Sequence, residues 1–234
     1  MTSFVLLPGL AGDARMWAPQ LAALQAHAPC VSDVHQRGDS IAEMAAVLLG
    51  QTRGPLLLCG ASMGGIIAME AARQAPERVR GLALLGTTAR PETPDMRKLR
   101  EDAIALFERG RVAEVITPNI AMAFHPDNAS DPRLVADYLA FVLDAGAERL
   151  IRQNRAIIER PDARLHLPSL RCPTLVMCGD ADQLTPMACS REIAAAVPGA
   201  ELVAVPRCGH MLTMEQPDLV NARLAAWLQA LQRP

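Results

Sequence analysis

The most constraining feature of this chain is a glycine-flanked serine where a strand pattern meets a helix pattern. The continuous apolar run 55–59 is followed directly by residues 60–65, Gly-Ala-Ser-Met-Gly-Gly, and a helical spacing of apolar residues begins at Ile66. The run is typical of a buried strand. In this context G-x-S-x-G predicts a nucleophile elbow, a sharp turn that projects the serine hydroxyl above a sheet. Ser62 is therefore the candidate nucleophile, and the Met63 N–H at the helix start is a candidate oxyanion donor.

Short apolar runs alternate with helical patterns on both sides of this turn. Strands are predicted over 4–7, 30–34, 55–59, 79–85, 173–178 and 202–205, and helices over 13–26, from 39 or 40, from 62 to about 74, over 186–197 and over 218–231. Apolar strands joined by helices indicate a parallel sheet that is covered on both faces. We therefore expect an α/β fold, a three-layer α/β/α sandwich with a mostly parallel sheet of about six strands.

The alternation stops between residues 90 and 160, where no strand pattern occurs. Amphipathic helices that are punctuated by prolines replace it. Ordinary crossover helices are the alternative, but three or four in succession exceed what one crossover needs. We predict a helical cap, 90–160, that lies over a core formed by 1–89 and 161–234.

Composition narrows the class of protein further. The formal net charge of −2 in 234 residues does not favour nucleic acid or an anionic membrane as a partner. The sequence shows no secretory signal and no apolar stretch long enough to span a membrane. The six cysteines lack C-x-x-C spacing, so we expect reduced thiols in a cytoplasmic protein, with no metal site and no cofactor. The oligomeric state is not indicated.

A serine hydroxyl needs an adjacent base, and imidazole is the natural one. His210 follows the last predicted strand and precedes the final helix. This is the carboxyl edge of the sheet, where open α/β folds bind ligands. The other four histidines, His27, His35, His125 and His166, are expected to be structural or solvated.

Two further loops are predicted to complete the site at this edge. The loop 179–186 carries Asp180 and Asp182, either of which can orient the imidazole; the strand alternation does not separate them. The loop 8–12, Pro-Gly-Leu-Ala-Gly, follows the first strand, and its glycines allow close approach of the main chain. The Leu10 N–H is the candidate second oxyanion donor; an ordinary Pro-Gly turn is the alternative.

The motifs resemble the α/β-hydrolase fold family, in particular its small capped carboxylesterase, enol-lactonase and carbon–carbon bond hydrolase branch. The matching positions are Ser62, Met63, Gly64 and Gly65 in the elbow, Gly179, Asp182 and Pro186 in the acid loop, and Gly209, His210, Glu215 and Pro217 around the histidine. The order serine, acid, histidine is also that of the family. The resemblance, not the residue spacing, favours Asp182 over Asp180.

The chain departs from the family pattern at its start. Pro8 stands where His is usual before Gly9, and the loop after the second strand lacks one glycine of the usual motif. The first predicted strand begins almost at Met1, so we expect the family's N-terminal strand pair to be absent.

The resemblance implies a serine hydrolase that cleaves a small carboxylic ester, lactone or thioester through a Ser62–His210–Asp182 triad and an acyl-enzyme. The only partner it implies is a small ester-like substrate. A carbon–carbon bond hydrolase using the same site is one alternative. A non-catalytic, ligand-binding protein of the same fold is the other.

Overall fold

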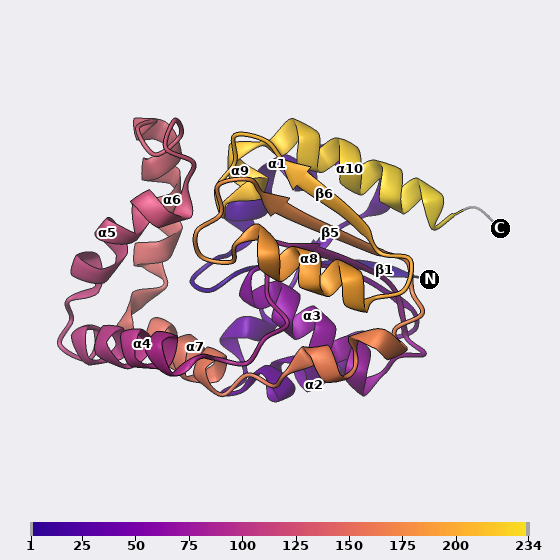
Figure 1. The fold of residues 1–234 in the computed structure, drawn as a ribbon, viewed down its shortest axis with the longest axis horizontal. Helices are drawn as coiled ribbons and strands as arrows, with labels where there is room; N and C mark the ends of the chain where they lie inside the picture. The colour runs from indigo at the N-terminus through magenta and orange to yellow at the C-terminus, as the bar shows by residue number, and fades with distance from the viewer. Residues whose placement is uncertain (1, 233–234) are drawn as a thin grey trace.

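The computed structural model describes residues 2–232, which form one six-stranded sheet between two layers of helices (Figure 1). The strands are β1 (Ser3–Leu7), β2 (Cys30–Val31), β3 (Leu56–Ala61), β4 (Val79–Leu85), β5 (Thr174–Gly179) and β6 (Glu201–Val205). Their order is β2-β1-β3-β4-β5-β6, and every neighbouring pair is parallel. In the described residues no strand precedes β1. The predicted sheet is therefore confirmed.

Helices cover both faces of the sheet because its strands are apolar on both faces. One face packs against α1 (Ala18–Ala23) and α10 (Pro217–Ala230), and the other against α2 (Ile41–Gln51), α3 (Met63–Gln74) and α8 (Met187–Ala196). Ser40 caps α2, where its hydroxyl accepts the Glu43 N–H. No helix within residues 2–232 is long and apolar enough to cross a membrane.

Two predicted elements differ in extent. The predicted helix 13–26 is divided into η1 (Ala14–Trp17), α1 and η2 (Gln25–His27), and Pro19 lies in the first turn of α1, where its missing N–H costs least. The predicted strand 30–34 shortens to β2 and is followed by the 3-10 turn η3 (Val34–Gln36). The Ser32 N–H still donates to Leu6 O at 2.9 Å, and the chain then leaves the sheet at η3, where Val34 and His35 are buried.

The helical insertion lies between β4 and β5, as predicted. It consists of α4 (Pro94–Phe107), α5 (Val112–Ala123), α6 (Pro132–Asp144) and α7 (Gly146–Ile158), and the short turns η4 (Ala163–Leu165) and η5 (Leu167–Ser169) lead back to the sheet. Helices α4 and α7 lie side by side, and α5 and α6 extend beyond one end of the sheet (Figure 1). The exact limits of the cap, 90–160, stay a prediction.

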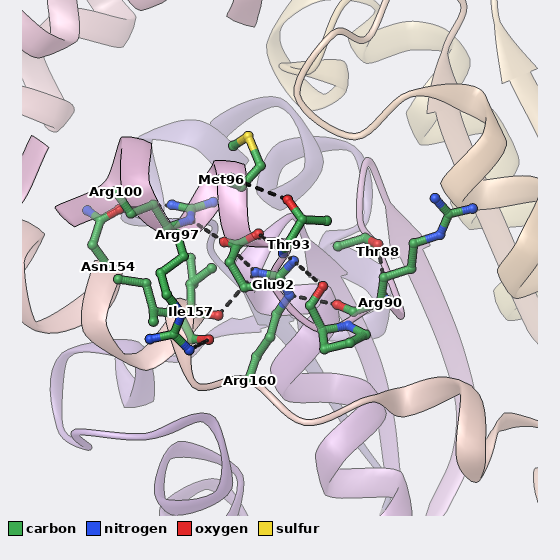
Figure 2. Close-up of polar contacts among 12 residues, drawn as sticks. Thr88, Arg90, Glu92, Thr93, Met96, Arg97, Arg100, Asn154, Ile157 and Arg160 are labelled. Atoms are coloured by element: carbon green, nitrogen blue, oxygen red, sulfur yellow. Dashed lines mark hydrogen bonds and ion pairs between the residues drawn. The ribbon is translucent and has the colours of Figure 1, made fainter. Parts of the chain in front are cut away.

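A buried ionic cluster ties together the two ends of this insertion (Figure 2). Glu92 accepts hydrogen bonds from Arg100 Nε at 2.6 Å and from Arg160 Nη1 at 2.8 Å. The Glu92 side chain is 3% exposed and that of Arg160 7%. Arg160 also donates to the carbonyl oxygen of Arg90, and Arg100 to Asn154 Oδ1 on α7, at 2.8 Å each. The segments that lead into and out of the cap are thus held by one set of charges.

Candidate active site

Ser62 occupies a strained turn between β3 and α3. Its backbone has φ 52° and ψ −117°, a region that residues with a side chain rarely adopt. The end of β4 and the loop after it hold this conformation, because the Ser62 N–H donates to Leu85 O at 2.8 Å and the Thr87 hydroxyl donates to Ser62 O at 2.7 Å. Glycine is required at Gly64, where a Cβ would clash with the carbonyl oxygen of Leu7. The elbow is therefore packed directly on the end of β1.

His210 and Asp182 are in contact at the carboxyl ends of β5 and β6. His210 Nδ1 lies 2.8 Å from Asp182 Oδ2. Since a carboxylate only accepts, this contact assigns the proton to Nδ1 and leaves Nε2 as an acceptor. Asp182 Oδ1 accepts the N–H groups of Leu184 and Thr185 at 2.9 Å each. Burial alone would raise the Asp182 pKa, but His210 and the hydrogen bonds from Thr185 lower it below the usual value.

Asp180 has a different role from Asp182. Its carboxylate accepts the backbone N–H groups of Arg207 and Cys208, at 3.1 Å each, and so shapes the loop that carries His210. Of the two carboxylates left open by the sequence, Asp182 is the one in contact with the imidazole.

The elbow and the His210–Asp182 pair lie at the same edge of the sheet. Ser62 is bonded through its N–H to Leu85, and the next residue, Gly86, is close to the pair: a Cβ built there would lie 3.2 Å from Asp182 Oδ2 and 3.4 Å from His210 Nδ1. Within residues 2–232 the Ser62 hydroxyl makes no hydrogen bond, so its contact with His210 stays a prediction. Such bonds commonly tighten only when substrate binds.

The predicted oxyanion loop lies against the elbow. A Cβ on Gly9 would be 3.3 Å from Ser62 Cβ. The loop closes through a hydrogen bond from Gly12 N–H to Gly9 O at 3.0 Å, with Ala11 at φ 60°. In the described part of the chain, neither the Leu10 N–H nor the Met63 N–H donates to a protein acceptor. Both predicted donors are thus free to meet a ligand oxygen.

Glu215 supports this site, although the sequence showed it only as a motif match. Its Oε1 accepts the N–H groups of Gly209 and Met211, at 2.9 and 3.1 Å, on either side of His210. Its Oε2 accepts the N–H of His125 and the side-chain amide of Asn128, at 2.8 and 2.9 Å, from the cap. One carboxylate therefore joins the histidine loop to the cap. The signal available in the sequence was that Glu215 directly follows the segment 208–214, which contains no acidic residue.

Three of the four remaining histidines hydrogen-bond to nearby backbone through their rings. His35 is buried, and its Nε2 donates to Gly12 O at 2.8 Å; His166 Nε2 donates to Met69 O at 3.2 Å. Burial lowers the pKa of both imidazoles. His125 Nδ1 accepts the Asp127 N–H, and His27 ends the turn η2. Residues 2–232 contain no cluster of three or more His, Cys, Asp or Glu side chains placed to hold a metal ion.

Comparison with known proteins extends the resemblance over nearly the whole chain. Residues 4–223 match the alpha/beta hydrolase family. RutD from Shigella flexneri serotype X, whose name describes a carbamate hydrolase, is 30% identical over 97% of this chain and 91% of its own length. RutD from Escherichia coli K12 (DH10B) matches to the same extent.

Solved structures agree with this match. A thermophilic esterase from Thermogutta terrifontis, solved with malate bound, superposes with a TM-score of 0.88 at 26% identity and covers 100% of this chain and 91% of its own. The enol-lactonase from Burkholderia xenovorans LB400 superposes with a TM-score of 0.85 at 25% identity, over 98% and 92%. The chain therefore belongs to the alpha/beta hydrolase family and is a hydrolase.

Proposed function

We propose that this hydrolase cleaves a small carboxylic ester, lactone or thioester through Ser62, His210 and Asp182. The observation that supports this most strongly is the 2.8 Å contact between His210 and a buried Asp182, at the same edge of the sheet as a serine in a strained elbow. A carboxylate that holds the Nδ1 proton leaves Nε2 free to act as a base. The two unpartnered N–H groups beside Ser62 are suited to a developing negative charge.

The reaction has two halves. His210 Nε2 takes the proton of Ser62 Oγ as that oxygen attacks the substrate carbonyl, and the Leu10 and Met63 N–H groups donate to the resulting oxyanion. The carbonyl re-forms, the bond to the alcohol or thiol breaks, and His210 returns its proton to the leaving group. Water, deprotonated by the same imidazole, then attacks the acyl-enzyme and releases the carboxylic acid and Ser62.

A fluorophosphonate probe and one variant test the proposal. The wild-type chain should be labelled at Ser62, while Ser62→Ala should remain unlabelled and lose about 10⁶ in kcat on an activated ester. Circular dichroism of the variant checks that it folds. Ester turnover retained by Ser62→Ala would refute the assignment, and a wild-type chain that binds a ligand but is not labelled would indicate a non-catalytic binder.

A carbamate is the second candidate substrate, because RutD is similar over almost the full chain. The same attack on a carbonyl applies, with a carbamoyl group on Ser62 in place of an acyl group. Comparing kcat/KM for matched ester, lactone, thioester and carbamate substrates separates these classes. A carbamate preference would replace the ester assignment and keep the triad.

A further inference from the structure

Gln153 on α7 joins the cap to the predicted oxyanion loop by a hydrogen bond. Its Oε1 accepts the Ala11 N–H at 2.8 Å, and its Nε2 donates to the carbonyl oxygen of His35 at 3.0 Å. The side chain is 0% exposed. Gln153 is 142 residues from Ala11 and 118 from His35, so this amide joins three distant segments: the cap, the loop after β1 and the turn after β2.

The oxyanion loop needs such a support. Ala11 has φ 60°, which is unfavourable for a residue with a Cβ. The Ala11 N–H belongs to the peptide that follows Leu10, so its hydrogen bond to Gln153 restrains the backbone on one side of Leu10. On the other side of Leu10, the Gly9 carbonyl oxygen accepts the Gly12 N–H, and the His35 side chain donates to Gly12 O at the end of the turn. Without Gln153 the peptide at Ala11 would lose its one acceptor.

Helix α7 is itself held on both sides of Gln153. Arg152 Nη2 donates to Gln36 O at 2.6 Å, next to the His35 carbonyl. Asn154 accepts from Arg100 at 2.8 Å and so belongs to the buried cluster around Glu92 (Figure 2). The residues on either side of Gln153 thus anchor α7 to the turn after β2 and to α4.

We infer that Gln153 is a positioning residue for the proposed reaction. It orients the loop 8–12 so that the Leu10 N–H can stabilise the oxyanion, and through it the cap contributes to the chemical step as well as covering the site. The inference rests on the proposed function, since it assigns a use to the Leu10 donor.

Two substitutions separate positioning from plain stability. Gln153→Met keeps the side-chain length and removes both hydrogen bonds. We expect kcat on an activated ester to fall about 30-fold, with KM changed less than about threefold, because an oxyanion donor acts mainly in the transition state. Gln153→Glu keeps an acceptor for the Ala11 N–H but buries a charge, so it should be less stable than Gln153→Met and yet have a kcat at least about fivefold higher.

Gln74→Met is the matched control. Gln74 also bridges two segments through its amide, which donates to Ala42 O at 2.9 Å, but it lies at the far end of α3. We expect it to lower the melting temperature and leave kcat within about twofold of wild type.

Fluorophosphonate labelling of the wild type keeps the two claims apart. An unlabelled, inactive wild type refutes the proposed function and this inference together. A labelled, active wild type beside a Gln153→Met variant with kcat within about twofold overturns the inference alone. The inference is also overturned if the more stable variant, Gln153→Met, has a kcat equal to or higher than that of Gln153→Glu. Circular dichroism checks that each variant is folded, and only folded variants are compared.

Discussion

Replacing Asp182 by Asn should disable the site by reversing a hydrogen bond, with little change in shape. In the wild type, Asp182 Oδ1 accepts two backbone N–H groups, from Leu184 and Thr185, while Oδ2 accepts from His210 Nδ1 and from the Thr185 hydroxyl. An Asn side chain has one oxygen, and that oxygen must stay on the two backbone donors. Its NH₂ group then faces His210 Nδ1, which must become an acceptor.

The consequence is the wrong tautomer. With Nδ1 unprotonated, neutral His210 carries its proton on Nε2 and cannot accept the one on Ser62. A loss of this kind costs about 10⁴ in kcat, equivalent to about 5.4 kcal/mol of transition-state stabilisation. KM should change little, because Asp182 is buried and all of its hydrogen bonds are to protein groups.

Initial rates on an activated ester at neutral pH measure this effect, and Asp180→Asn is the matched control. Asp180 accepts backbone N–H groups of the histidine loop and does not touch His210, so its amide variant should keep kcat within about tenfold of wild type. If Asp182→Asn retains more than about a tenth of the wild-type kcat, or if Asp180→Asn is the more impaired, the assignment of the acid is wrong.

Two other substitutions test the supports of the cap, and a third, in an exposed pair, is their control. Glu92→Gln leaves the buried Arg160 without its carboxylate and should lower the free energy of unfolding by about 3 kcal/mol, near the low end for a broken buried pair, because three carbonyls still accept from Arg160. Urea denaturation measures this loss, and one below about 1 kcal/mol contradicts it. Burial would raise the Glu92 pKa, but the two arginines lower it below 4.5. The extra stability of the wild type over Glu92→Gln is therefore complete above about pH 4.5 and is lost as the pH falls through the lowered pKa. Asp102→Asn, in an exposed pair, should cost less than about 0.5 kcal/mol in the same assay. Glu215→Gln replaces one carboxylate oxygen, which accepts from two N–H donors, by an NH₂ group that can only donate. The free energy of unfolding should fall by about 2 kcal/mol, and kcat about tenfold because His210 is displaced; unchanged kcat in a folded variant would refute the role of Glu215 in placing that loop.

The sheet and the elbow could be predicted because their signals are local. Apolar runs such as 173–178 mark strands buried on both faces, and this one became β5; the change from strand to helix spacing around Ser62 marks a turn whatever the rest of the chain does. The helical insertion was visible for the same reason, as a long stretch with only helical periodicity. The ends of elements were less predictable: the strand expected over 30–34 is only two residues long because the chain turns at Val34 into η3, which buries Val34 and His35.

The choice between two equivalent residues depended on packing. Asp180 and Asp182 stand two positions apart in one loop, and the same chemistry suits either. Only the folded loop turns Asp182 toward His210 and Asp180 toward the backbone of Arg207 and Cys208. The family resemblance favoured Asp182, but the residue spacing did not.

The sequence alone therefore determined the fold class and predicted the serine and the loops that carry the imidazole and the acid. Only the tertiary structure placed Gln153 against the loop 8–12, and Glu215 between the histidine loop and the cap. Periodicity along the chain records which side chains are buried, because burial depends on the local face of a helix or strand. It does not record the partner of a buried polar group, since that partner lies in a distant segment and is selected when the elements pack together.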